Sequence, residues 1–129
     1  KRVAATLEPL GPRVALRGFL PHERIMAAFA RAAIATVPSQ WEEPFGRTAL
    51  EAMACGCALI ASRRGGMPEV IGDAGILMPN PNTASLAKAI LLLARDDSMR
   101  AALQGRARAR ATAEFDIRRW AARLDEMRG

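Results

Sequence analysis

Aromatic residues are scarce in this 129-residue chain: they make up 5% of it, and tyrosine is absent. Most modules that bind single-stranded nucleic acid stack bases on aromatic side chains, and no such module is recognisable here. The net charge of +6 is therefore weak evidence for a nucleic-acid partner, and we expect none.

Histidine and cysteine are also scarce, with one His and two Cys. Cys55 and Cys57 flank Gly56, while His22 is far away in the sequence, so a metal site would lack ligands. A disulfide is disfavoured as well, because one cysteine closes an expected helix and the other opens an expected strand. We predict no metal site and two small core thiols in a reducing, cytoplasmic compartment.

Long apolar runs are missing, and none approaches the roughly 20 residues that span a bilayer. Half of the residues are hydrophobic and 25% are charged, which is typical of a folded globular protein. The length suits one domain spanning residues 1–129. Because the chain starts with Lys1 and not Met, we expect an N-terminally incomplete part of a longer protein.

Arginine supplies most of the positive charge and gathers late in the chain. The late arginines are Arg100, Arg106, Arg108, Arg110, Arg118, Arg119, Arg123 and Arg128. Acidic residues such as Asp116 and Asp125 interrupt the run. We interpret it as a solvated helical face, and a peripheral contact with an anionic membrane or a lipid-linked acceptor stays open.

Apolar strands and amphipathic helices alternate in the first two thirds of the chain. We expect strands at residues 14–19, 33–37, 57–61 and 75–78, and helices at residues 21–32 and 46–55. Strands that are apolar throughout indicate a parallel sheet covered on both faces. The prediction is an α/β, Rossmann-like parallel sheet with flanking helices over about residues 14–80.

The chain becomes entirely helical after Pro81, which gives a helical C-terminal tail over about residues 83–129. Thr83 is the expected N-cap of a first helix, in which Leu91, Leu92 and Leu93 supply apolar contact. A second helix is expected to begin at Asp96 or Asp97 and a third at Asp116.

Residues 33–55 hold the candidate site, because they form a strand, a loop and a helix start in succession. The helix is expected to begin at Gly46 and to end at Cys55 and Gly56. Free N–H groups and the helix dipole at such a start favour an anion, and glycine at this position permits a close approach of the backbone. Thr48 supplies either a hydroxyl donor or only a first-turn residue.

Three linked motifs carry a resemblance to a known family. They are Glu43-Pro44-Phe45-Gly46, Glu51-Ala52-Met53-Ala54-Cys55-Gly56 and Gly65-Gly66-Met67-Pro68-Glu69. This series resembles the signature of retaining glycosyltransferases of family 4, the group 1 enzymes built from two Rossmann-like domains that face each other across a cleft. The resemblance implies the C-terminal, donor-binding domain of this two-domain B-type fold.

The same resemblance implies roles for individual residues. Glu43 is similar to the catalytic glutamate that contacts the donor sugar and steadies an oxocarbenium-like transition state. Phe45 and Gly46 match positions whose backbone amides touch sugar and phosphate. Glu51 matches the glutamate that holds the ribose hydroxyls, for which two carboxylate oxygens suit a vicinal diol.

Three further donor-binding positions follow from the resemblance. The nucleotide base is expected near Arg17 and Gly18, at the end of the first strand. Arg47 stands in the first helical turn, where the family commonly has an apolar residue.

The implied function is to bind a nucleotide-diphosphate sugar for retaining transfer to an acceptor glycan, lipid or small molecule. No cofactor is implied, and an acceptor-binding N-terminal domain is expected upstream. A non-catalytic sugar-nucleotide-binding module and a nucleotide-sugar epimerase of similar fold are the alternatives. We expect the isolated chain to be catalytically silent, since transfer needs an acceptor held against the donor.

Overall fold

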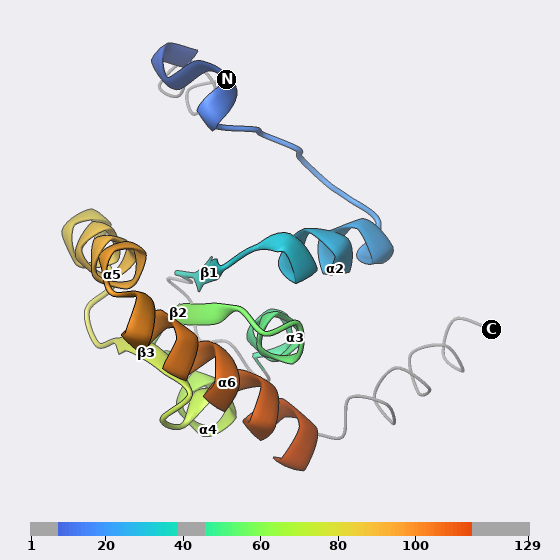
Figure 1. Cartoon of the computed structure of the whole chain (residues 1–129), viewed down its shortest axis with the longest axis vertical. Helices are drawn as coiled ribbons and strands as arrows, with labels where there is room; N and C mark the ends of the chain where they lie inside the picture. Colours follow the sequence, from blue (N-terminus) through green and yellow to red (C-terminus); the bar gives the residue numbers. More distant parts are fainter. Residues whose placement is uncertain (1–7, 39–45, 115–129) are drawn as a thin grey trace.

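The computed structural model describes residues 8–38 and 46–114 (Figure 1). In chain order the elements are η1 (Glu8–Arg13), α2 (His22–Arg31), β1 (Ile34–Val37), α3 (Arg47–Ala54), β2 (Ala58–Ser62), α4 (Met67–Ile71), β3 (Gly75–Met78), α5 (Thr83–Arg95) and α6 (Asp97–Glu114). Glu43, Phe45 and the helix expected from Asp116 lie outside the described residues.

A parallel sheet with the strand order β1-β2-β3 forms the centre of the molecule. Thr36 pairs with Ile60, and Ile60 pairs with Ile76. All five residues of β2 are buried, as expected for a central strand that is apolar on both faces. The predicted strands at residues 33–37, 57–61 and 75–78 and the α/β class are thereby confirmed.

Two hydrophobic clusters cover the two faces of this sheet. Side chains alternate along a strand, so Leu59 joins the cluster under α3 and α4, and Ile60 joins the cluster under α5. Helix α6 takes part in both, because Leu103 belongs to the α5 cluster and Ala107 to the α3 and α4 cluster. Figure 1 shows α6 crossing the sheet between these helices.

The prediction of a strand at residues 14–19 is wrong. These residues form an extended connection between η1 and α2 that runs apart from the sheet (Figure 1). Leu16 and Phe19 are exposed. An extended segment becomes a strand only when a neighbouring backbone pairs with it, and no described strand lies beside this one.

Asn82, and not the predicted Thr83, is the N-cap of α5. The Asn82 carboxamide oxygen accepts from the Ser85 N–H at 2.8 Å, and the Ser85 hydroxyl accepts from the Asn82 N–H at 3.0 Å. This reciprocal pair is a capping box. Both Asn82 and Thr83 are good capping residues, so the prediction was one residue out.

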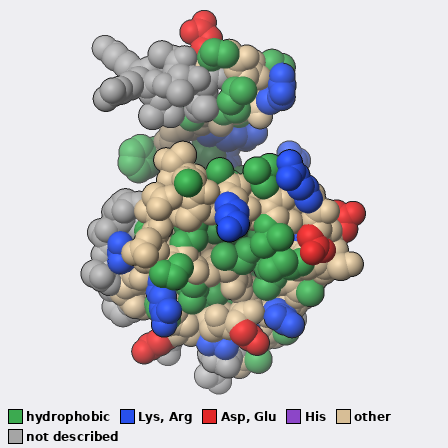
Figure 2. Space-filling model, turned by 90° about the vertical axis from the view of Figure 1, so that its left-hand side faces the viewer, with side chains coloured by type: hydrophobic (Ala, Val, Ile, Leu, Met, Phe, Trp, Pro, Cys, Tyr) green, Lys and Arg blue, Asp and Glu red, His purple; other side chains and the backbone are tan. Residues whose placement is uncertain are grey.

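The expectation that Leu91, Leu92 and Leu93 all supply core contact is correct only for Leu93, which is fully buried. Leu91 is 48% exposed and Leu92 is 45% exposed. Successive residues of a helix are rotated by about 100°, so three adjacent leucines cannot share one face. Figure 2 views the α5 side of the molecule, where hydrophobic side chains gather at the surface.

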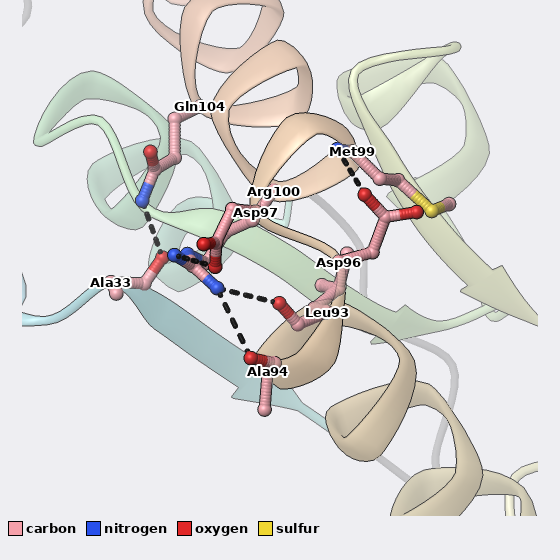
Figure 3. Close-up of polar contacts among 8 residues, drawn as sticks. All are labelled: Ala33, Leu93, Ala94, Asp96, Asp97, Met99, Arg100 and Gln104. Carbon is pink, nitrogen blue, oxygen red and sulfur yellow. Dashed lines mark hydrogen bonds and ion pairs between the residues drawn. The ribbon is translucent and has the colours of Figure 1, made fainter.

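The turn from α5 to α6 is held by polar contacts (Figure 3). Asp96 accepts the Met99 N–H at 2.9 Å, which confirms that α6 begins at the predicted Asp96–Asp97 pair. Arg100 donates to the Leu93 carbonyl oxygen at 2.8 Å and pairs with Asp97 at 2.8 Å. Arg100 is therefore engaged by protein groups, in contrast to the predicted solvated face.

Gln104 ties α6 to the start of β1 by donating to the Ala33 carbonyl oxygen at 3.0 Å (Figure 3). Both α5 and α6 also pack on β2 and β3.

Across residues 8–38 and 46–114, no helix combines the length and the hydrophobicity that a membrane crossing requires.

Candidate functional site

Gly46 sets the start of α3 at the carboxyl edge of the sheet. Its backbone is left-handed, with φ of 60° and ψ of 36°, and its carbonyl oxygen accepts the first helical bond from the Leu50 N–H at 2.9 Å. A Cβ at this position would lie 3.2 Å from Val70 Cγ2 and 3.3 Å from Met67 Sδ. Both the positive φ and the close approach of α4 require glycine here.

The N–H groups of Arg47 and Thr48 belong to the first turn of α3, where no helical carbonyl is available to accept them. Both side chains are exposed. The structure therefore brings the predicted positions 46, 47 and 48 together as one helix start, with the positive end of the helix dipole on the edge of the sheet.

Glu51 lies on the same helix and its side chain is only 15% exposed. Its Oε2 atom lies 3.8 Å from His22 Nδ1, and its Oε1 atom lies 4.0 Å from Arg47 Nε. Both distances exceed that of a good hydrogen bond. The carboxylate is thus held near two basic groups and keeps its capacity to accept hydrogen bonds from other donors.

The sequence pattern did not single out His22 as a site residue. The only signal was its place at the start of a helix, and that signal says nothing about a contact with residue 51. The contact arises because α2 packs across α3, which brings the first residue of α2 to the side of Glu51.

Arg17 and Gly18 are not brought to this helix start. Arg17 lines a surface groove of about 430 Å³ together with Arg24 and Arg31 of α2. Among the described residues, no hydrogen bond or ion pair joins Arg17 to the residues of α3. Gly18 has a φ of 62° in the extended connection, and a Cβ there would meet nothing within 4 Å.

A second loop reaches the same edge between β2 and α4. The Arg63 N–H donates to the Met78 carbonyl oxygen at 2.9 Å, which continues the strand pairing by one residue. Gly65 has a φ of 51°, and the Met67 N–H closes a turn onto the Arg64 carbonyl oxygen at 3.0 Å. Because Met67 and Val70 then contact Gly46, this loop and the start of α3 form one packed unit.

The two cysteines are free thiols that pack α2 onto the core. Cys57 donates to the Phe29 carbonyl oxygen at 3.1 Å, and Cys55 faces the Met26 carbonyl oxygen at 3.8 Å. Burial, with a smaller effect of Cys55, raises the pKa of Cys57 to about 11. Burial and the charge of Glu51 raise the pKa of Cys55, so neither thiol is an activated nucleophile at neutral pH.

Within the described ranges, no group of three His, Cys, Asp or Glu side chains is arranged to hold a metal ion. The catalytic candidate Glu43 and the amide candidate Phe45 lie outside those ranges, and their placement stays a prediction.

Known proteins resemble this chain in both sequence and fold. A D-inositol 3-phosphate glycosyltransferase of Corynebacterium jeikeium is 35% identical over 107 residues, which cover 80% of this chain and 25% of that protein. The chain thus spans about a quarter of the length of this relative.

Two solved structures superpose with a TM-score of 0.79. The Anabaena HepE protein in complex with UDP-glucose is 28% identical, and the match covers 98% of this chain and 35% of that one. The C-terminal domain of the group 1 glycosyltransferase LpcC of Francisella tularensis is 26% identical, with 90% and 62% covered.

These likenesses confirm the expected C-terminal fold of a B-type glycosyltransferase. The model of the family described as glycosyl transferases group 1 matches residues 3–110, a range that includes all three sequence motifs. This chain belongs to the group 1 glycosyltransferase family.

Proposed function

We propose that this chain is the donor half of a retaining glycosyltransferase and binds a nucleotide-diphosphate sugar. The start of α3 carries the proposal: Gly46 opens the helix at the carboxyl edge of the sheet, and the shielded Glu51 carboxylate lies beside it. The HepE complex with UDP-glucose, on a similar fold, supports this class of ligand.

The diphosphate is the chemically demanding part of such a donor, because negative charge develops on it as the sugar leaves. The N–H groups of Gly46, Arg47 and Thr48 at the start of α3 and the helix dipole are fixed donors for that charge. Fixed donors of this kind make a divalent metal and any further cofactor unnecessary in the proposed mechanism.

Glu51 is the proposed partner of the ribose hydroxyls. A carboxylate accepts two hydroxyl hydrogens at once, and its two basic neighbours, at 3.8 and 4.0 Å, lie too far away to occupy its oxygens with good hydrogen bonds. For Arg17 and Gly18 to contact the base, the connection of residues 14–20 would have to lie closer to α3 than it does here.

Glu43 is the proposed catalytic residue at the sugar, and the Phe45 amide is proposed to touch the same ligand. We assign Glu43 no nucleophilic role: the leaving group departs and the acceptor arrives on the same face of the sugar. The chain spans about a quarter of the length of its relative, so an acceptor glycan, lipid or small molecule is proposed to bind elsewhere in the full protein. The proposed location of the protein is the cytoplasm.

Calorimetric titration of the full-length gene product with UDP, UDP-glucose and other nucleotide sugars tests the proposal, with free uridine and free glucose as controls. A nucleoside diphosphate is expected to bind at least tenfold tighter than its nucleoside, since helix N-termini favour anions. Equal affinities for the nucleoside diphosphate and the nucleoside would argue against a diphosphate site, and so would the absence of binding by either one.

Transfer assays then test the mechanism. Product NMR is expected to show the anomeric configuration of the donor, and activity is expected to persist in excess EDTA. Inversion of configuration would contradict the retaining mechanism. Loss of activity that Mg²⁺ or Mn²⁺ restores would contradict metal independence.

A further inference from the structure

Three arginines of α6 lie at the C-terminal ends of three other helices. Arg100 donates to carbonyl oxygens at the end of α5 (Figure 3). Arg110 donates to carbonyl oxygens at the end of α4. Arg108 lies against Gly56, which follows α3, so that a Cβ on Gly56 would overlap its guanidinium. Cations at helix C-termini are favourable because the last carbonyls carry partial negative charge.

The contact of Arg110 with α4 is bidentate. Its Nε donates to the Val70 carbonyl oxygen at 2.8 Å, and its Nη2 donates to the Glu69 carbonyl oxygen at 2.7 Å. Gly72, with a φ of 55°, leaves room for the guanidinium, since a Cβ there would lie 2.7 Å from Arg110 Cζ. Charge-assisted bonds of this length are stronger than neutral ones.

Helix α4 needs such support, because it is a single short helix of five residues. Its own hydrogen bonds include Val70 N–H to the Gly66 carbonyl oxygen and Gly72 N–H to the Pro68 carbonyl oxygen. One turn of helix is barely stable by itself, since fixing the first turn costs more than its bonds return. Packing and the Arg110 contact must therefore hold it in place.

Val70 links Arg110 to the candidate site. Its carbonyl oxygen accepts from Arg110, and its Cγ2 atom lies 3.2 Å from the point where a Cβ of Gly46 would be. A shift of α4 would therefore move the surface against which the first turn of α3 packs. The end of α5 held by Arg100 has no such link, because α5 packs on the opposite face of the sheet.

We propose that Arg110 is a positioning residue for the diphosphate end of the donor site: it holds α4, and α4 holds Gly46 and the first turn of α3. This inference rests on the proposed function for its ligand, but the mechanical link from Arg110 to Gly46 can be measured without any ligand.

The test compares Arg110→Ala and Arg110→Lys with two control variants of the full-length protein. Arg100→Ala removes the same kind of guanidinium-to-carbonyl contact from α5, so it is matched for loss of stability. Arg106→Ala removes an exposed arginine of α6 that makes no hydrogen bond or ion pair with the described residues. Hydrogen exchange of the Val70, Gly72 and Leu50 amides and titration with UDP are measured on all four variants and the wild type.

Arg110→Ala is expected to speed exchange at Val70, Gly72 and Leu50 and to weaken UDP binding about 3- to 10-fold, the range for a residue that couples to a site without touching the ligand. For Arg110→Lys, both the exchange rates and the UDP affinity are expected to lie between those of Arg110→Ala and those of the wild type. Arg100→Ala should lower the melting temperature comparably, while UDP affinity stays within about twofold, since distant sites act independently.

Two results would overturn the inference. One is an equal effect of Arg100→Ala and Arg110→Ala on UDP affinity, which would reduce Arg110 to a general stabilising role. The other is unchanged exchange at Leu50 in Arg110→Ala, which would break the link to α3. If the wild type bound no nucleoside diphosphate, the proposed function would fail, and exchange at Leu50 would still decide whether Arg110 positions the first turn of α3.

Discussion

The Nδ1 atom of His22 lies 3.8 Å from the Oε2 atom of Glu51. This contact joins the first residue of α2 to the candidate site on α3, although the two residues lie 29 positions apart in the sequence. The other carboxylate oxygen of Glu51, Oε1, lies 4.0 Å from Arg47 Nε. Two basic side chains therefore stand beside the carboxylate before any ligand arrives.

Glu51→Gln is expected to weaken nucleoside diphosphate binding by about 1–3 kcal/mol, the range for losing a charge-assisted hydrogen bond. Calorimetry on the full-length protein measures this change. Glu23→Gln is the control, because Glu23 is an exposed carboxylate on α2. Equal affinities for the wild type and Glu51→Gln would remove Glu51 from the site.

Gly46→Ala is expected to lower the free energy of unfolding by about 1–2 kcal/mol, because alanine is strained at positive φ and its Cβ would crowd Val70 and Met67. Gly105→Ala is the matched control in α6, where a Cβ meets nothing within 4 Å, and should raise stability by up to about 1 kcal/mol. Urea denaturation of both variants checks the pair. An equally stable Gly46→Ala would mean that the left-handed start of α3 is not required.

Asn82→Ala is expected to cost about 1 kcal/mol of stability through loss of the capping box, whereas Thr83→Ala should stay within about 0.5 kcal/mol of the wild type. Thermal denaturation of the two variants distinguishes the observed cap from the one expected from the sequence. A larger loss from Thr83→Ala would show that α5 begins differently in solution.

The thiols are expected to react slowly with iodoacetamide in the folded protein at pH 8 and rapidly in urea, because burial raises the pKa of both. The pKa of Cys57 is about 11 in the folded state against an ordinary 9.0. Its contribution to stability is therefore complete below pH 9 and declines as the pH rises toward 11, where the unfolded chain loses the proton first.

Urea denaturation of the wild type and Cys57→Ala at pH 8 and pH 10.5 measures this decline. The difference in free energy of unfolding between the two proteins is expected to be smaller at pH 10.5 than at pH 8. A difference that grows with pH would contradict the sign derived from the raised pKa.

Much of the fold follows from local sequence. The strands at residues 33–37, 57–61 and 75–78 were predictable because continuous apolar runs between turn residues suit a covered parallel sheet. The ends of α3 were predictable because glycine is the residue that most readily accepts the positive φ found at helix ends. Gly46 and Gly56 both adopt positive φ in the structure. At the end of α3 the Gly56 N–H bonds to Met53 and the Cys57 N–H bonds to Ala52, a local pattern that glycine favours.

Other features depend on how distant segments pack. Residues 14–19 have the composition of a strand, but a strand exists only where another backbone pairs with it. Arg100, Arg106 and Arg110 look alike in the sequence, and only the packing of α6 decides which guanidinium reaches a carbonyl oxygen.

By itself, the sequence determined the α/β pattern, the ends of α3 and the family to which the chain belongs, because these follow from residue types and their near neighbours. Only the tertiary structure decided that His22 meets Glu51 and that Arg110 reaches Val70 across 40 residues. The physical reason is that such contacts exist only after α2 and α6 have packed on the core. The local sequence pattern of a helix does not predict which distant residues its side chains will contact.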